Sequence, residues 1–388
     1  MVAIGVADLM ADFNYEMVLA VLPLFLTSGL GAPALAVGLV EGVADGASAG
    51  VRLWSGWYSD RIAWRKRMAV GGYAATVVGL GSLVVVGSWP LVVVSRGLAW
   101  MGRGLRQPVR SAMLAGSVSR PDLGKAFGFH EALDTLGALG GPIVAFLLLS
   151  SGAGFRSIFW AALVPGVLCV LLFALLTRDP RRVLTERPAV RARLPGSFRR
   201  LVAVVAVFGA GNFAPAFFTL RAAEMLTPSL GHAAALSGAV LFYILHQAIA
   251  SAASFPGGWL ADRFGKPLVL AAAYAAFSAA CVLGIAGSGP LAVALMALPL
   301  GISAPIVIAT EQSLTSSLVP ERVAGTAFGV LGAVNGVGDL ASSVVAGILW
   351  TSIGAGAGLG YGAVLGLAGA VLLVLLRPQL EPPGEVLG

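Results

Sequence analysis

Acidic side chains recur at helical spacing near the start of the chain. Asp8, Asp12 and Glu16 stand four residues apart, so on a helix they share one face. Glu41 and Asp45 repeat this spacing further along. Buried carboxylates can exchange protons, so Asp12, Glu16, Glu41 and Asp45 predict proton coupling or a polar cavity. Two alternatives remain: Asp8 only marks the start of a helix, and Asp45 pairs structurally with an arginine.

A second titratable group occurs in the stretch 124–142. Asp134 follows Glu131 by three residues and His130 by four, so on a helix it can pair with either. Histidine titrates near neutrality, which suits a proton carrier. The alternatives are a fixed salt bridge for Asp134 and a packing or interfacial role for His130.

Four arginines lie on one face of a further apolar segment. Arg96, Arg103, Arg106 and Arg110 follow spacings that keep them on one side of a helix. Unpaired charges in apolar surroundings are costly. The arginines must therefore meet the acids near 8–16, 41–45 and 130–134, an anionic substrate, or both. For Arg106 and Arg110, anchoring at an interface is the alternative.

The composition predicts an integral membrane protein. Of 388 residues, 58% are hydrophobic and 11% charged, and the mean hydropathy is +0.90. Cys169 and Cys281 lie in apolar runs and fit neither a disulfide framework nor a metal site. The net charge of +7 comes from basic clusters without interleaved aromatic residues, which argues against nucleic acid. The first apolar run lacks a basic start, so no cleavable signal peptide is expected.

Breaks at glycine, proline and charge clusters divide the chain into apolar spans, each of about 20 residues. They predict an all-α membrane protein with twelve transmembrane helices, at about 4–28, 34–57, 68–87, 91–115, 126–150, 156–177, 201–224, 232–256, 268–286, 290–314, 325–350 and 356–376. Basic loops and the positive-inside rule place both termini in the cytoplasm, in the inner membrane.

The chain also repeats itself after about 200 residues. The segment 56–61 matches 258–263, 126–128 matches 327–329, and Asp12-Phe13 matches Asn212-Phe213. These matches predict two pseudo-symmetric six-helix bundles around a central cavity, at 1–177 and 201–377. A polar cytoplasmic linker at 178–200, with affinity for anionic lipid, separates them, and a cytoplasmic tail follows at 378–388.

The repeated loop resembles the signature of the major facilitator superfamily, G-x-x-x-D-R-x-G-[RK]-[RK]. The second copy fits well, whereas the first has Ala63 in place of a glycine. The resemblance implies a transporter that works by alternating access, and not an enzyme. It also implies a conformational latch formed by Gly56, Asp60, Arg61, Gly258, Asp262 and Arg263.

A narrower resemblance is to the proton-coupled antiporters of that superfamily. Gly128, Gly137, Gly141 and Pro142 keep the spacing of their helix-5 motif, although Ala145-Phe146 replace its final glycine pair. The apolar, proline-containing stretch 21–26 is similar to the end of helix 1 in many drug exporters. These similarities imply export.

The second half keeps polarity but drops charge, because Asn212 and Asn335 stand where the first half has Asp12 and Asp134. Coupling is therefore expected in the first half, and shape and hydrogen bonding in the second. The cavity candidates of the second half are Asn212, Arg221, His246, Gln247, Glu311, Asn335 and Asp339.

The predicted function is proton-coupled export of a small molecule by a monomer in membrane lipid, with the proton gradient as energy source and no cofactor. The alternatives are inward symport of an organic anion or nutrient, and export of a divalent metal held by Asp12, Glu16 and His130. A sensor that transports nothing is a further class. The sequence contains no nucleotide-binding loop and no nucleophile constellation, which argues against ATP-driven pumping and catalysis.

Overall fold

The computed structural model describes residues 2–59, 64–115, 123–177, 194–320 and 324–380, and all regular secondary structure in these ranges is helical. The first half of the chain forms α1 (Val2–Leu24), which continues as a π-helical turn (Phe25–Gly29), then α2 (Ala34–Ser59), α3 (Arg65–Gly81) with a 3-10 turn (Ser82–Val84), α4 (Trp89–Ala115), α5 (Leu123–Ser150) and α6 (Phe155–Leu176).

The second half forms α7 (Gly196–Gly209), α8 (Ala216–Leu230), α9 (His232–Phe264), α10 (Lys266–Ala286), α11 (Gly289–Leu318), α12 (Ala324–Ser352) and α13 (Ala355–Leu380). Single glycines connect some of these helices directly. Gly231 and Gly265 have φ angles of 76° and 90°, a backbone conformation that side chains with a Cβ rarely adopt. The chain can therefore reverse between α8, α9 and α10 without a longer loop.

Ten membrane-spanning candidates occur among the described residues, by length and apolar composition. The helix α4 is not one of them, and it carries four arginines along its length. The helices α7 and α8 are not among them either, because each is short. The other predicted spans each correspond to one long helix.

The predicted continuous span at 201–224 is wrong, because the chain leaves the helix between Ala210 and Pro215. Pro215 has no N–H and disfavours a helical conformation at Ala214. Side chains from α12 bond the freed backbone: the Ala214 N–H donates to Ser343 Oγ at 3.1 Å, and Ser342 Oγ donates to the Asn212 carbonyl at 3.0 Å. In addition, α7 begins at Gly196, inside the predicted linker.

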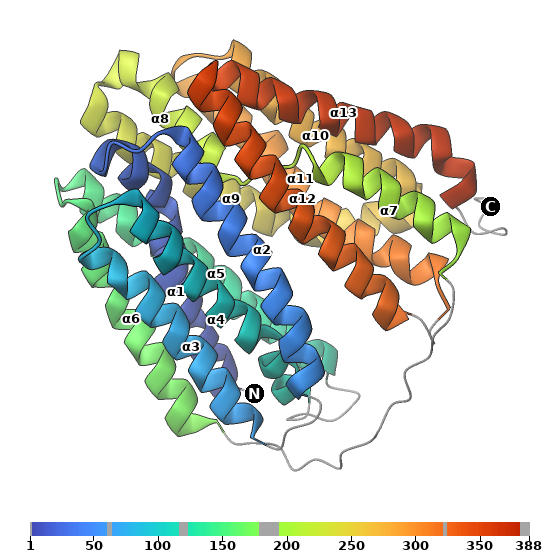
Figure 1. Ribbon diagram of the computed structural model, residues 1–388, viewed down its shortest axis with the longest axis horizontal. Helices are drawn as coiled ribbons and strands as arrows, with labels where there is room; N and C mark the ends of the chain where they lie inside the picture. The colour runs from blue at the N-terminus through green and yellow to red at the C-terminus, as the bar shows by residue number, and fades with distance from the viewer. Residues whose placement is uncertain (1, 60–63, 116–122, 178–193, 321–323, 381–388) are drawn as a thin grey trace.

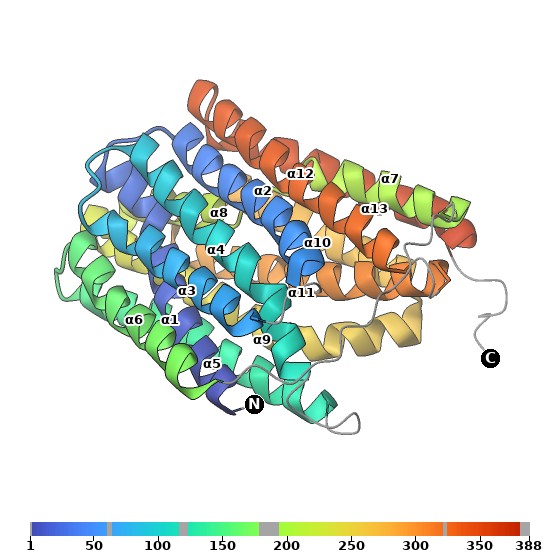
Figure 2. The same ribbon diagram turned by 60° about the horizontal axis from the view of Figure 1, so that its bottom comes forward.

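The helices of the two halves meet along α2 and α12 and also along α5 and α9. Figures 1 and 2 show α1, α3 and α6 on one flank and α7, α10 and α13 on the other, with α2 and α12 side by side between them. Small residues allow this close approach, since a Cβ on Gly42 would lie 3.0 Å from the Leu340 carbonyl oxygen. At the start of α2, the Leu35 N–H donates to Thr351 Oγ1 at 2.9 Å.

Candidate functional site

A charged cluster surrounds Asp8 on α1. The side chain is fully buried and accepts a hydrogen bond from the Tyr73 hydroxyl of α3. Its Oδ1 lies 3.3 Å from Arg106 Nη1 and 3.0 Å from Arg110 Nη1, both on α4. The interpretation of Asp8 as only a helix-start residue is therefore wrong, and so is interfacial anchoring for Arg106, which is 1% exposed.

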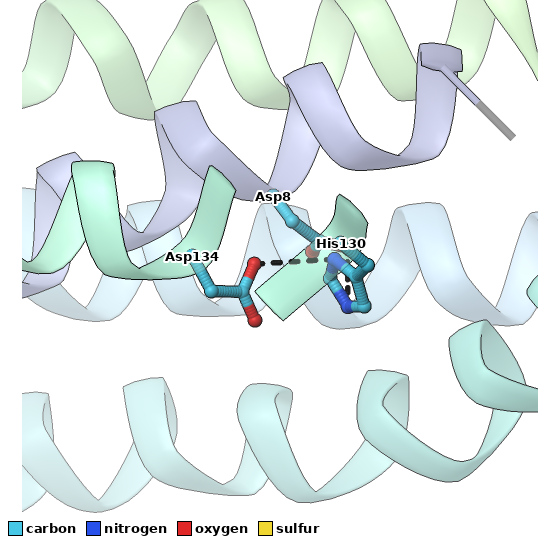
Figure 3. A group of neighbouring side chains, drawn as sticks. All are labelled: Asp8, His130 and Asp134. Carbon is cyan, nitrogen blue, oxygen red and sulfur yellow. Dashed lines mark ion pairs between the residues drawn. The ribbon is translucent and has the colours of Figure 1, made fainter. Parts of the chain in front are cut away.

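His130 and Asp134 join this cluster from α5, as Figure 3 shows. His130 Nε2 lies 3.5 Å from Asp8 Oδ2, and His130 Nδ1 lies 3.3 Å from Asp134 Oδ1. Asp134 Oδ2 is 3.9 Å from Arg110 Nη1. Asp134 thus has both of the partners that its spacing and the arginine stripe suggested. The side chain of Glu131 lies outside the described part of the structure.

The carboxylates of this cluster are a poor metal site. Asp8, His130 and Asp134 each offer a ligand atom, all within 4.8 Å of one another. However, two guanidinium groups contact the Asp8 carboxylate, compete for its oxygens and would repel a divalent cation. The structure brings His130 to Asp8 and Asp134 and not to Asp12 and Glu16, the ligand set considered from the sequence.

Glu41, Asp45 and Arg96 form a second cluster between α2 and α4. Arg96 Nη2 donates to Glu41 Oε2 at 2.7 Å, and its guanidinium lies 3.1 Å from the centre of the Trp100 ring. The Trp100 indole N–H donates to Asp45 Oδ1 at 2.9 Å. Arg96 therefore pairs with Glu41, and within the described ranges no arginine forms a salt bridge with Asp45.

Two tyrosines form hydrogen bonds with Arg103 of α4 and with Glu16 of α1. Arg103 Nη2 donates to the Tyr15 hydroxyl at 3.2 Å, and its guanidinium also lies over the Tyr15 ring. The Tyr243 hydroxyl of α9 donates to Glu16 Oε2 at 2.5 Å. This bond connects the two halves of the chain. With the ion pairs above, three of the four α4 arginines contact acids of α1, α2 and α5, as the arginine stripe predicted.

Asp12 differs from its neighbours on α1. Its side chain is 5% exposed, yet it makes no hydrogen bond or ion pair with any residue that the structure describes. It packs against α5 beside Gly137, where a Cβ would lie 2.9 Å from the Asp12 Cβ. Asp12 is thus a buried carboxyl group without a contacting counter-ion among the described residues, although the guanidinium groups of Arg106, Arg103 and Arg110 lie near enough to attract its charge.

A central cavity of about 310 Å³ lies beside these clusters. Residues from α7 to α12 line it, together with Asp45 of α2. Of the second-half candidates, the cavity brings together Asn212, His246, Glu311, Asn335 and Asp339. An adjoining cavity of about 410 Å³ shares Asp45, Glu311, Asn335 and Asp339 and extends to Arg52 near the end of α2.

The two other second-half candidates lie elsewhere. Gln247 is not among the described residues that line either cavity. Arg221 on α8 donates from Nε to the Gly284 carbonyl at 2.8 Å, and its Nη1 lies 3.0 Å from Glu224 Oε2. The arginines of α4 are also absent from the described linings of both cavities, so they do not supply positive charge there.

The acids of the central cavity differ in how many hydrogen bonds their carboxylates accept. Glu311 accepts from the Tyr274 hydroxyl and from Asn335 Nδ2, each at 2.8 Å. The Asp339 carboxylate makes no hydrogen bond or ion pair with any described residue. His246 is 5% exposed, and its imidazole likewise has no hydrogen-bond partner within the described ranges.

The predicted latch lies mostly outside the described residues. Asp60 and Arg61 are not described, and neither is the side chain of Asp262. Gly56 and Gly258 belong to α2 and α9. Arg263 lies over the rings of Trp259 and Phe264, at 5.2 and 5.6 Å from their centres.

The glycines of the helix-5 motif pack α5 against α1. A Cβ on Gly137 would lie 2.6 Å from the Leu9 carbonyl oxygen, and a Cβ on Gly141 would lie 2.5 Å from the Phe13 carbonyl oxygen. Pro142 follows inside α5, and Gly128 lies in the part of α5 whose side chains are not described. At Gly137 and Gly141 a residue with a side chain would therefore overlap the backbone of α1.

Several polar partners have no counterpart in the sequence-based candidate list. One of them, Asp8, shares the helical spacing of the candidates Asp12 and Glu16. The others are aromatic residues whose hydroxyl or indole N–H donates to a buried acid: Tyr73, Trp100, Tyr243 and Tyr274. An aromatic residue with a polar tip inside an apolar span is the signal that could have identified them.

Comparison with known proteins agrees with this architecture. A family model described as Major Facilitator Superfamily matches residues 4–338 and, in a second alignment, 201–387. An MFS-type transporter of Methanocaldococcus jannaschii is 30% identical over 379 residues, covering 96% of this chain and 94% of its own length. An MFS-type transporter of Mycobacterium tuberculosis is 26% identical over 359 residues, covering 88% of this chain and 83% of its own.

Solved structures share the fold at low sequence identity. The nucleoside transporter NupG superimposes with a TM-score of 0.81 at 12% identity, over 98% of this chain and 99% of its own. A POT family transporter superimposes with a TM-score of 0.79 at 13% identity, over 98% and 96%. The chain therefore belongs to the major facilitator superfamily, a family of membrane transporters and not of enzymes.

Proposed function

We propose that this transporter is a secondary active exporter that couples outward movement of a small molecule to inward movement of protons. The observation that carries the proposal is the central cavity, which is lined by Asp45 of α2 and by helices of the second half and lies beside buried, titratable clusters. A site between two helix groups can be exposed to either side of the membrane in turn, as alternating access requires.

The proposed architecture has twelve crossings in two six-helix bundles, 1–177 and 201–377. In it, α4 crosses with its arginines turned towards the acids of α1, α2 and α5, and α7 and α8 together form one broken crossing. A broken helix is tolerated at membrane depth where it lines a cavity and its backbone finds partners, and the bonds from Ser342 and Ser343 support this. The loops with Asp60 and Asp262 would latch the two states.

Asp12 is the proposed proton carrier. Since it has no partner among the described residues, it can take up and release a proton without breaking a salt bridge. Asp134 contacts Arg110, so protonation of Asp134 would also weaken the contact between α4 and α5, whereas protonation of His130 would strengthen its contacts with Asp8 and Asp134. Glu16, bonded to Tyr243, would transmit the change to the second half.

The direction of transport rests on the helix-5 motif. Its glycine spacing, shared with antiporters, supports export, and the basic loops support cytoplasmic termini in an inner membrane. Inward symport is the alternative. The solved relatives include a nucleoside transporter and a POT family transporter in complex with 5-aminolevulinic acid. At this identity, those likenesses support the fold alone.

Flux in proteoliposomes tests the proposal. The purified protein is reconstituted with a trapped pH-sensitive dye, a proton gradient is imposed, and candidate compounds are added one at a time. We expect a transported compound to move protons against its own direction, and everted vesicles to accumulate it. Movement of compound and protons in the same direction would establish symport. A substrate flux that is the same with and without the proton gradient would rule out proton coupling.

A further inference from the structure

We propose that the central cavity binds an organic cation, a protonated amine attached to an apolar body. This inference rests on the proposed transport function, because it treats the cavity as the substrate site. It differs from the expectation, based on the α4 arginines, that an anion is drawn into the transporter.

The charge of the cavity carries the first step. Asp45, Glu311 and Asp339 converge on it from three different helices, α2, α11 and α12. Arg52 is the one arginine or lysine among the described lining residues of the two cavities; it lines the adjoining cavity and not the central one, and its side chain is exposed. Carboxylates held together in low dielectric repel one another, and a bound cation relieves that repulsion.

The hydrogen bonds that each carboxylate already makes within the protein indicate which acid would bind the ligand directly. Both Glu311 oxygens accept hydrogen bonds from Tyr274 and Asn335, which fixes this side chain in place. Asp45 accepts one bond, from Trp100, at Oδ1. The Asp339 carboxylate is uncommitted among the described residues and is therefore the direct counter-ion.

His246 provides an independent indication of a ligand. It is buried and lines the cavity, and its imidazole has no hydrogen-bond partner among the described residues. Its ring nitrogens are not among the fully buried polar atoms that lack a partner, so they are open to the cavity, where a ligand can bond them. A neutral imidazole presents one acceptor nitrogen, which matches an N–H of a protonated amine.

The remaining lining fits an apolar body. Phe208, Phe213 and Phe277 are buried aromatic residues of the cavity wall, and Leu300 lies beside them. Aromatic faces attract cations and pack against apolar groups. A volume of about 310 Å³ suits a small organic molecule. A bare metal ion fits less well, since hard cations require several oxygen ligands and one carboxylate here is uncommitted.

Binding of three probes of similar shape tests the charge preference. The purified protein is titrated with 4-phenylbutylamine, 4-phenylbutan-1-ol and 4-phenylbutyrate, at a pH where the amine is protonated and the acid ionised. We expect the amine to bind at least about tenfold more tightly than the alcohol, because a hydrogen bond to a charged group adds that much. The butyrate should bind most weakly.

Two variants locate the contact. Asp339→Asn keeps the shape of the side chain, and it should weaken amine binding about ten- to a hundredfold while leaving the alcohol unchanged, which also shows that the cavity is intact. Glu224→Gln, on α8 outside the central cavity, is the matched control and should leave amine binding unchanged. His246→Leu should weaken the amine more than its N,N,N-trimethyl derivative, which has no N–H to donate.

Tightest binding by the butyrate, equal binding of amine and alcohol, no binding of any probe, or full amine affinity in Asp339→Asn would each overturn the inference. These measurements need no gradient or vesicle. Failure of proton-coupled export would thus leave amine binding intact, whereas failure of this inference would leave the gradient-driven flux of another substrate class intact.

Discussion

Buried acids in this transporter differ in what balances their charge. Asp8 is surrounded by Tyr73, Arg106, Arg110 and His130. Asp12, one helical turn away, has no partner among the described residues. The two carboxylates therefore suit opposite tasks: Asp8 stabilises the fold, and Asp12 is free to change its protonation.

Asp8→Asn should destabilise the protein. It would leave Arg106 and Arg110 buried without the carboxylate that both contact, and breaking a buried ion pair in this way costs roughly 3–5 kcal/mol. Thermal unfolding in detergent measures the loss. Tyr73→Phe is the control, since it removes one hydrogen bond at about 1 kcal/mol and keeps the ion pairs. Equal losses in the two variants would contradict a structural role for Asp8.

Asp12→Asn should uncouple transport while leaving stability nearly unchanged. The substitution keeps the size of the side chain and breaks no described ion pair. We expect gradient-driven uphill transport to disappear and substrate exchange across the membrane to persist. Parallel flux and exchange assays in proteoliposomes measure both. Normal uphill transport by Asp12→Asn would show that another group carries the proton.

The sequence predicted which residues share a face, but not which partners they meet. Helical spacing places Asp8, Asp12 and Glu16 on one stripe. Their different surroundings arise because α3, α4 and α5 approach Asp8, α5 passes Asp12 at Gly137, and α9 approaches Glu16. Such contacts depend on how the helices pack against one another. The spacing of residues within one helix does not show which other helices pack against it.

At the scale of helices, small residues set how closely the elements approach. The backbone of α1 runs directly beside Gly137 and Gly141 of α5. Two glycines of the motif that resembles antiporters thus lie in this close contact. If these glycines hold α1 and α5 together, then a larger side chain at one of them should push the two helices apart and destabilise the protein.

Gly141→Ala should lower the free energy of unfolding by about 1–3 kcal/mol, because the added methyl group overlaps the α1 backbone. Gly71→Ala on α3 is the matched control. A Cβ there meets no atom within 4 Å, so the better helix propensity of alanine should raise stability by about 0.5–1 kcal/mol. Thermal unfolding of both variants gives the comparison. A stabilised Gly141→Ala variant would show that α1 and α5 are not in tight contact.

Helix positions were more predictable from sequence than helix continuity. Apolar length located most of the spans, since a bilayer requires about 20 apolar residues for each crossing. It failed at 201–224, where Pro215 and the neighbouring glycines interrupt the helix although the apolar run continues. The break is stable because Ser342 and Ser343 bond the open backbone, and these partners come from a distant part of the chain.

At the scale of the whole molecule, the internal repeat predicted two related halves but not how they meet. The adjoining cavity reaches Arg52 near the end of α2, whereas the start of α2 is held against α12 by the bond from Leu35 to Thr351. The Glu16–Tyr243 bond also joins the halves. The contact between α2 and α12 at Leu35 must therefore part if the cavity is to open towards the other side.

A covalent link at that contact should stop transport. In a Leu35→Cys/Thr351→Cys variant, a short bifunctional thiol reagent should join α2 to α12 and reduce gradient-driven flux to the level of empty vesicles. The native Cys169 and Cys281 are buried and should not react. The single variants Leu35→Cys and Thr351→Cys are the matched controls, because the reagent can modify each thiol but cannot join α2 to α12, so flux should be unchanged. Full transport by the linked Leu35–Thr351 pair would mean that the halves do not separate at this end, and alternating access through this cavity would have to be abandoned.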